Sequence, residues 1–335
     1  MKNKKLNLLI IFLLTGIVLY IVLKDNFTEK IHYMLSFNIF FLLVSFLMMF
    51  IYWFLKGLVL YNCTRKFKSD YTKKKGIGLM ITSQFFHSIT PFASGGQPWQ
   101  IYRLKKEGLT VGEGTIVAIQ DFIAFQSALI LLGIVAVISN QIFHIIPSDS
   151  HLLYLVIIGF TLNIIVIIGL FIIAFSKKWN KKIINGAVKL LSKIKIVKDR
   201  EKMLQKAEEF IKNFHESAEI LFQDKQNFFK IIGLNFVALV FQYSIPFFLM
   251  LGLGIHENLY YVLIASAYVM LIDSMMPTPG STGGLEYGFM SFFSVFVKGA
   301  KLSALMIVWR MITYYFGLIM GSIVLGIDKE SKAWG

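Results

Sequence analysis

The sequence has few of the residues on which soluble enzymes and disulfide-stabilised domains depend. It contains one cysteine, Cys63, in 335 residues, so neither an internal disulfide nor a thiol metal cluster can form. Charged residues make up only 16% of the chain, less than a soluble domain of this length carries. Its histidines lack metal-ligand spacing, and zinc-protease, P-loop and nucleophile-elbow motifs are missing. We therefore expect no metal, no nucleotide cofactor and no direct coupling to ATP.

Apolar residues dominate what is present. They make up 56% of the chain, and its mean hydropathy is +0.66. Several runs can cross a hydrocarbon core about 30 Å thick, so the sequence predicts an all-α polytopic membrane protein. The clearest predicted spans are residues 6–23, 38–60, 114–138, 152–175, 229–252 and 302–326. The first span, residues 6–23, follows several lysines and so resembles a signal peptide. It lacks a small-residue cleavage site, so we expect a retained helix.

The basic residues indicate the topology. The net charge of +15 alone would also fit a nucleic-acid-binding protein, but the charges lie between apolar spans rather than on one soluble face. The stretches 61–76 and 176–228 are rich in lysine, whereas 139–151 contains no lysine or arginine. The positive-inside rule therefore predicts a multi-pass protein of the cell membrane with cytoplasmic N- and C-termini and no nucleic-acid partner.

One short motif occurs twice, and each copy interrupts an apolar region. Residues 90–96 read TPFASGG and residues 278–284 read TPGSTGG, both of the form T-P-x-small-hydroxyl-G-G. Because proline lacks an N–H donor and glycine weakens a helix, each motif predicts a broken helix inside or near the bilayer. Paired interruptions in matching halves of a chain point to the binding site of a transporter.

The charges that flank the motifs predict re-entrant hairpins. Both 61–76 and 98–113 are basic, so 77–97 should enter and leave on the cytoplasmic face. Its helix before Pro91 would be about 20 Å long, too short to cross. The region 259–297 should dip in from the opposite face. Each half then reads span, span, broken hairpin, span, which predicts two inverted repeats of three spans plus a hairpin, whose tips meet near the midplane.

We expect one membrane domain over residues 1–335, with one half at about 1–138 and the other at about 152–326. A polar insert at about 176–228 lies between them. Its helical spacing of apolar residues and lysines predicts an amphipathic helix on an anionic membrane surface, followed by a second helix at about 200–222. A two-helix cytoplasmic cap without lipid contact explains this pattern equally well.

Three ionisable side chains lead the site candidates, because charges inside spans are costly and mark functional sites. Arg310 lies well inside the last predicted span, and Asp121 lies a few residues into the span at 114–138. They follow the two motif threonines at nearly equal distance, so they either pair with each other or each face a cavity. Glu286 follows the second glycine pair, where a carboxylate caps free N–H groups or serves a substrate or a proton.

Residues around the motifs complete the predicted binding set. Arg103 suits a phosphate, because a planar guanidinium can donate two parallel hydrogen bonds. The glycine pairs should leave N–H groups bare at helix starts, which favours an anion. The predicted substrate-binding residues are Arg310, Glu286, Arg103, Asp121, Gln97, Thr90, Gly95, Gly96, Thr278, Gly283 and Gly284. No catalytic residue and no metal ligand is predicted.

Two strings of the sequence resemble one family. Residues 90–103, TPFASGGQPWQIYR, and residues 276–286, MPTPGSTGGLE, are similar to the flippase-like transmembrane region of the lysylphosphatidylglycerol synthase/flippase, the multiple peptide resistance factor. The resemblance covers nearly the whole chain, and Arg310 in its aromatic-flanked span also fits. It implies movement of a phospholipid or another lipid-linked anion between leaflets, with Glu286 and Arg310 as functional residues and Arg103 behind them.

Full-length relatives add a soluble domain that charges phosphatidylglycerol with lysine. This sequence ends at Gly335, just after the last predicted span, so we expect the synthase activity not to carry over. The sequence thus predicts a lipid flippase with a phospholipid or lipid-linked substrate, no cofactor and, as one option, a homo-oligomer. Two alternatives stay open: an intramembrane lipid-modifying transferase, for which Asp25 and Glu29 are the early candidates, and a non-transporting membrane partner that docks through the insert.

Overall fold

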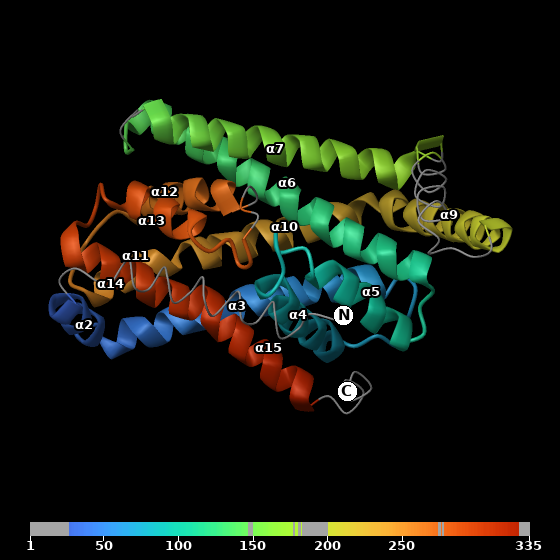
Figure 1. The fold of residues 1–335 in the computed structure, drawn as a ribbon, viewed down its shortest axis with the longest axis horizontal. Helices are drawn as coiled ribbons and strands as arrows, with labels where there is room; N and C mark the ends of the chain where they lie inside the picture. The colour runs from blue at the N-terminus through green and yellow to red at the C-terminus, as the bar shows by residue number, and fades with distance from the viewer. Residues whose placement is uncertain are drawn as a thin grey trace.

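The protein is a bundle of helices, most of which run along the long axis of the molecule (Figure 1). This computed structural model describes residues 27–146, 150–176, 178–179, 182, 200–273, 276 and 278–327. In these ranges all regular structure is helical, apart from one isolated β-bridge. The prediction of an all-α protein is confirmed.

Four helical segments of the described chain are long and apolar enough to cross a membrane. They are α3 (Ile39–Thr64), α6 (Val111–Phe143), the pair α10 (Lys225–Tyr243) and α11 (Ile245–Gly252), and the segment α14 (Gly299–Arg310), η1 (Met311–Tyr315) and α15 (Phe316–Ile327). A fifth, α7 (Ser150–Phe175), contains the shorter apolar stretch Val156–Ile172. These helices match five predicted spans to within a few residues, and the sixth, 6–23, lies outside the described residues. The apolar helices agree with a multi-pass membrane protein.

Polar side chains fix where the long helices begin. Thr110 accepts a hydrogen bond from the Glu113 N–H, and the Glu113 carboxylate accepts one from the Thr110 N–H, so a complete capping box starts α6. Asp224 caps α10 through the Asn227 N–H, and its carboxylate also pairs with Lys66. The Lys66 ammonium is the main cause that lowers the pKa of the Asp224 carboxyl, and the Asn227 hydrogen bond adds to it. The loop after α3 is thereby joined to the start of α10.

Two helical hairpins occupy opposite ends of the bundle. One consists of α4 (Lys73–Ser88) and α5 (Gly96–Lys106), and the other of α12 (Leu259–Asp273) and α13 (Gly284–Phe293). Figure 1 shows α12 and α13 toward the end that carries α2 (Phe27–Leu35), and α4 and α5 toward the other. Their tips meet in an antiparallel bridge between Pro91 and Pro279. Equivalent prolines of the repeated motif therefore face each other where the two hairpins meet.

Glycines let the first hairpin pack closely against its neighbours. Gly317 and Gly321, spaced as G-x-x-x-G on α15, face α4: a Cβ atom on Gly321 would lie 2.8 Å from the Ile81 carbonyl oxygen. On the α3 side, a Cβ atom on Gly76 would lie 2.5 Å from the Gly57 carbonyl oxygen. Small residues of this kind allow helix backbones to approach in membranes, where packing rather than hydrophobicity drives association. Helix α4 is thus clamped between α3 and α15.

Most of the described part of the insert is helix α9 (Arg200–Gln223), in agreement with the predicted second helix at about 200–222. Its apolar residues Phe214, Ala218 and Leu221 are buried. The Gln120 amide on α6 donates a hydrogen bond of 3.1 Å to the Leu221 carbonyl, so this face of α9 packs on α6. Most of the first predicted insert helix lies outside the described residues.

Gly321→Ala tests the close contact between α15 and α4. The added methyl group must displace the Ile81 carbonyl or Phe85, and overpacking of this kind costs about 1–3 kcal/mol. The matched control is Gly326→Ala on the same helix, because open space surrounds that position and alanine favours a helix. Thermal unfolding in detergent should show a lower midpoint for Gly321→Ala and an unchanged or higher one for Gly326→Ala; equal midpoints would contradict the packing.

Candidate functional site

The two motif loops share a left-handed backbone at their third and fourth positions, although Gly95 and its equivalent Gly283 differ, with φ −77° and +97°. Phe92 and Ala93 have φ values of +55° and +49°, and the equivalent residues Gly280 and Ser281 have +59° and +54°. Three of these four residues are not glycine, and left-handed backbone costs such residues roughly 1–2 kcal/mol each. Strain of this size persists where the surrounding structure fixes the chain, and it gathers at functional sites.

The hydrogen bonds of the two loops also correspond. The Ala93 N–H donates to the Thr90 carbonyl at 3.2 Å, and the Ser281 N–H donates to the Thr278 carbonyl at 3.0 Å. The hydroxyl groups of Ser94 and Thr282 each donate to the carbonyl of their motif proline at 2.9 Å. The hydroxyl position of the T-P-x-small-hydroxyl-G-G motif thus closes the turn in both copies.

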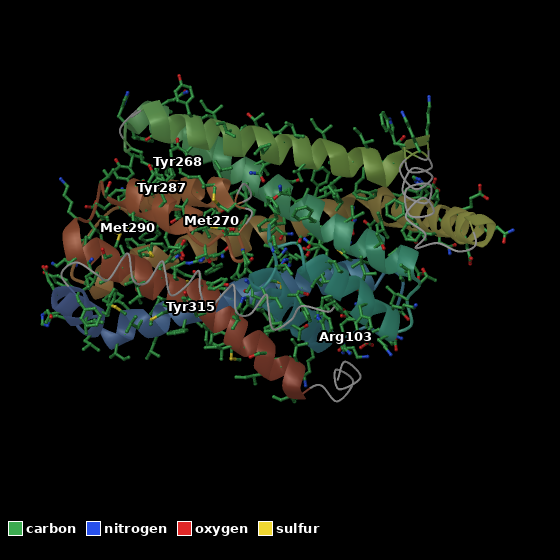
Figure 2. The ribbon with its side chains drawn as sticks, viewed as in Figure 1. Arg103, Tyr268, Met270, Tyr287, Met290 and Tyr315 are labelled. Atoms are coloured by element: carbon green, nitrogen blue, oxygen red, sulfur yellow. The ribbon has the colours of Figure 1, made fainter. Side chains whose placement is uncertain are left out.

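A cavity of about 90 Å³ lies where the two loops meet. Its walls come from both loops and from α4, α10, α12, α13 and the end of α14. They include Ala93, Gly280, Gln84, Gln242, Arg310 and Tyr314. Met270 on α12 also lines the cavity, and Figure 2 shows it in the central part of the bundle, far from Arg103. The space is large enough for several water molecules.

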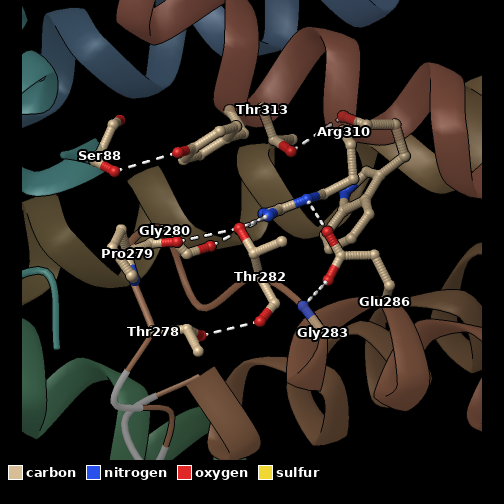
Figure 3. A network of polar contacts seen from close by, with 11 residues as sticks. Ser88, Thr278, Pro279, Gly280, Thr282, Gly283, Glu286, Arg310 and Thr313 are labelled. Atoms are coloured by element: carbon tan, nitrogen blue, oxygen red, sulfur yellow. Dashed lines mark hydrogen bonds and ion pairs between the residues drawn. The ribbon is translucent and has the colours of Figure 1, made fainter. Parts of the chain in front are cut away.

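Arg310 is the charged centre of this cavity, and its side chain is 5% exposed. Its Nε lies 2.7 Å from Glu286 Oε1, and its Nη2 donates to the Gly280 carbonyl at 3.0 Å and contacts Thr282 Oγ1 at 3.5 Å (Figure 3). The guanidinium also lies over the Tyr314 ring, 4.5 Å from its centroid. A buried charge is tolerated only when it is paired and hydrogen-bonded, and the second loop supplies those partners.

Glu286 joins the loop to Arg310 through both carboxylate oxygens. Oε2 accepts a hydrogen bond of 2.6 Å from the Gly283 N–H at the start of α13, while Oε1 faces Arg310. Gly283 has φ +97°, a conformation that side chains rarely adopt, so glycine is required for this cap. The carboxylate therefore acts as a helix cap, one of the two roles predicted for it, and also pairs with Arg310; a role toward a substrate or a proton stays a prediction.

A short π-helix, η1, follows Arg310 and turns the next residues toward the first hairpin. The Tyr314 hydroxyl donates to the Ser88 carbonyl at 3.0 Å, at the end of α4. A Cβ atom on Gly280 would lie 2.0 Å from the Tyr314 ring, so the second loop packs directly on this ring. Insertions of this kind in α-helices are frequent at functional sites. Arg310 and Tyr314 thus hold the tips of both hairpins.

Asp121 belongs to a second buried ion pair and lies away from Arg310. Lys56 Nζ donates to Asp121 Oδ1 and to Asn235 Oδ1, both at 2.7 Å, and lies 5.0 Å from the centre of the Phe125 ring. Lys56, Asp121 and Asn235 are all buried and come from α3, α6 and α10. Of the alternatives for Asp121, a structural ion pair fits best, with Lys56 rather than Arg310 as the partner.

The remaining predicted site residues lie in or beside the loops. The Thr90 hydroxyl accepts from the Gly95 N–H and donates to the Phe86 carbonyl, both at 2.7 Å, and the Thr278 hydroxyl donates to the Thr282 carbonyl. The expectation of bare N–H groups is therefore wrong for Gly95 and, through Glu286, for Gly283.

Close packing explains the second glycine of each pair. A Cβ atom on Gly96 would lie 2.0 Å from the His87 ring, and one on Gly284 would lie 1.9 Å from the Met276 sulfur. Gln97 is half-buried in the first turn of α5 and does not line the cavity between the loops. These contacts explain glycine at both positions without a ligand, and a substrate-binding role for these residues stays a prediction.

Arg103 lies in the last turn of α5, at one end of the bundle (Figure 2). Its charge affects the pKa of Tyr71, which lies in the loop before α4. Burial raises the pKa of the Tyr71 hydroxyl, the Glu107 charge raises it further, and the Arg103 charge lowers it. The structure thus separates Arg103 from Arg310, so the two do not bind one group in this conformation.

Sequence reasoning missed Lys56 and Asn235 at the buried ion pair, and Gln84, Gln242 and Tyr314 at the cavity. Lys56 carried a usable signal, because a lysine inside an apolar span is costly and needs a partner. Gln84, Gln242 and Tyr314 carried none, because neutral polar residues are common in helices and only the three-dimensional fold brings them to one cavity.

Lys56→Met tests the buried pair on α3 and α6. It leaves the Asp121 carboxylate without its partner in the bundle, and breaking a buried pair costs about 3–5 kcal/mol. Adding Asp121→Leu removes the orphaned charge, so the double variant should recover most of that loss. Chemical unfolding in detergent of both single variants and the double variant measures the coupling; additive losses would contradict a structural pair.

Gly280→Ala tests the packing of the second loop on Tyr314. The matched control is Gly299→Ala, because Gly299 also has positive φ but open space around it. The control should lose roughly 1 kcal/mol from backbone strain, and Gly280→Ala about 1–3 kcal/mol more, because the Tyr314 ring must move. Thermal unfolding of both variants gives the difference, and equal losses would show that the ring contact contributes nothing.

Comparison with known proteins identifies the family to which the chain belongs. Residues 6–321 match the family described as the lysylphosphatidylglycerol synthase TM region. A UPF0104 membrane protein from Archaeoglobus fulgidus is 26% identical over 301 residues, which cover 84% of each chain. Because the match takes in nearly all of the sequence, the chain belongs to the lysylphosphatidylglycerol synthase transmembrane family.

Proposed function

We propose that the protein is a lipid flippase, which moves a phospholipid or a lipid-linked anionic head group between leaflets while the acyl chains stay in the bilayer. The observation that carries the proposal is the polar cavity at Arg310, between the tips of two hairpins from opposite ends of the bundle. The family membership supports a function linked to membrane lipids.

The proposal includes two inverted repeats with re-entrant hairpins. Its support is the matching left-handed turn in the two motif loops and the placement of α4–α5 and α12–α13 at opposite ends. Helix α4 has 16 residues, about 24 Å, which is short for a crossing. Irregular backbone at membrane depth must be buried in protein or line a wet cavity, and Ala93, Gly280 and Ser281 of the two loops line the polar cavity.

The proposed orientation places the end with α4 and α5 in the cytoplasm. Basic residues gather in the loops at that end, and the last turn of α5 adds three more. These residues are Arg65, Lys66, Lys68, Lys73, Lys74, Lys75, Arg103, Lys105 and Lys106. The positive-inside rule then gives a cytoplasmic C-terminus after α15 and, with the predicted first span, a cytoplasmic N-terminus.

A cysteine pair at the hairpin tips tests the transport proposal. For a head group to pass, the contact between Pro91 and Pro279 must open. Residues that face each other in an antiparallel bridge lie at a separation that a disulfide can span. In liposomes that carry Pro91→Cys/Pro279→Cys, oxidation should reduce the leaflet exchange of fluorescent phospholipids to the protein-free rate, and reduction should restore it.

The single variants Pro91→Cys and Pro279→Cys are the controls, because neither can form the bond and the native Cys63 is buried. Wild-type exchange equal to that of empty liposomes, for several lipid classes with and without ion gradients, would contradict the flippase. Product formed by pure protein from lipid and an activated donor would instead favour the transferase alternative.

A further inference from the structure

A π-helix interrupts the last long helical segment directly after Arg310. Helix η1 separates α14 from α15, and the Phe316 N–H donates to the Met311 carbonyl, a bond from residue i+5 to residue i. An α-helix closes this bond one residue earlier, so η1 inserts one extra residue into the segment. Because each residue turns an α-helix by about 100°, the insertion rotates α15 against α14 by roughly that angle.

The sequence of this segment is phased for an unbroken α-helix. Four residues with contacts to the hairpins follow one another at the i, i+4, i+7, i+11 spacing that lines one face of a regular α-helix: Arg310, Tyr314, Gly317 and Gly321. In the structure Arg310 contacts the second loop, whereas the two glycines face α4. The extra residue of η1 thus offsets two halves that the sequence would align.

Burial decides which half of the segment can turn. Every residue from 302 to 310 in α14 is buried, whereas in α15 (Phe316–Ile327), all of which the structure describes, only two glycines are. A rotation of α14 would break the ion pair of Arg310 and repack the surrounding core. A rotation of α15 changes its contact with α4 and the stack of Phe316 on Trp53. Conversion of η1 to α-helix would therefore turn α15 and leave α14 in place.

A rotation of α15 by one residue brings bulky side chains to its contact with α4. Phe316 and Met320 precede Gly317 and Gly321 by one position, so they move into the places that the two glycines hold. Those places have no room, because even a Cβ atom on Gly321 would lie 2.8 Å from the Ile81 carbonyl oxygen. Helix α4 must then move away from α15 and take the first motif loop with it.

We propose that η1 is the switch that opens the contact between the hairpin tips. In the observed state the Tyr314 hydroxyl of η1 donates to the Ser88 carbonyl at the end of α4, and Pro91 stays against Pro279. Conversion of η1 to α-helix withdraws Tyr314 from Ser88 and pushes α4 off α15, so the two loops part. The inference rests on the proposed flippase, which requires this opening, and adds the element that produces it.

Contacts of Phe316 and Tyr314 hold the segment in the observed state. The Phe316 ring stacks on Trp53, with ring centroids 5.2 Å apart, and meets the rings of Phe46 and Phe50 edge to face. The Tyr314 hydroxyl adds its hydrogen bond to the first hairpin. Conversion of η1 breaks both sets of contacts, so the closed state is the favoured one and the open state is a minor population.

Ser281→Cys reports the opening in the full chain. Ser281 is 2% exposed and lines the cavity between the loops, so a water-soluble methanethiosulfonate reagent reaches a cysteine there only when the loops part. The wild type gives the background, because its one cysteine, Cys63, is buried. The measurement is the labelling rate of the reporter in liposomes.

Deletion of Met311 removes the extra residue and with it the switch. The segment then becomes a regular α-helix in which Arg310 and α15 keep their observed directions, and little packing is lost because Met311 is 48% exposed. Labelling of Ser281→Cys should fall to the background. Deletion of Gly326 is the matched control, because open space surrounds this residue beyond the α4 contact, and it should leave labelling unchanged. Unchanged labelling in a folded Met311 deletion would overturn the proposal.

Tyr314→Phe should act in the opposite direction and raise labelling roughly two- to tenfold, because it removes one hydrogen bond that holds the closed state. Tyr268→Phe is its control. The Tyr268 hydroxyl is also buried and donates to a backbone carbonyl, that of Ala136, but Figure 2 shows Tyr268 apart from Tyr315 of η1. If size-exclusion chromatography shows that the Met311 deletion does not fold, this pair decides, and equal labelling in both tyrosine variants overturns the proposal.

Leaflet exchange separates this inference from the proposed function. Exchange at the wild-type rate in the Met311 deletion sinks the switch and leaves the flippase standing. Labelling that follows the expected changes, without exchange of any lipid by the wild type, sinks the flippase and leaves the switch standing. Loss of both labelling and exchange in the Met311 deletion, with both retained in the Gly326 deletion, supports the two together.

Discussion

The burial of one guanidinium sets the conditions for the rest of this structure. Arg310 lies in an apolar helix, and hydrocarbon offers it no solvation, so every compensating contact must come from the protein. The second loop supplies a carbonyl and a hydroxyl for this purpose, and the first turn of α13 supplies the carboxylate of Glu286. These contacts with Arg310 stabilise the conformation of the second loop. The positive φ of Ser281 would otherwise disfavour that conformation.

The molecule contains two buried ion pairs with different surroundings. Lys56 is enclosed by Asp121, Asn235 and the ring of Phe125, which together use its bonding capacity. Arg310 borders a cavity and keeps one edge free. Both pairs have zero net charge, which limits the electrostatic cost of placing them among apolar helices. The first joins three long helices, and the second joins a helix to the second motif loop, which the proposed transport requires to move.

Patterns local to the chain could be read from the sequence, and contacts between distant segments could not. The apolar runs gave five spans, the two T-P motifs gave two broken segments, and the helical period gave α9. The partner of Asp121 could not be read, because it depends on how α3 and α6 are rotated against each other. The N–H groups of Gly95 and Gly283 looked bare in the sequence, since the turn geometry that brings Thr90 and Glu286 to them is three-dimensional.

The residues that face each other at the hairpin tips are both prolines. Proline has no backbone amide hydrogen, so neither of these two residues can donate to the other, and neither leaves a donor unpaired when they part. Most backbone separations deep in a bilayer would strand such donors in hydrocarbon. At this seam the two facing prolines add no such donor, so an opening of the bridge exposes only the N–H groups of the neighbouring residues.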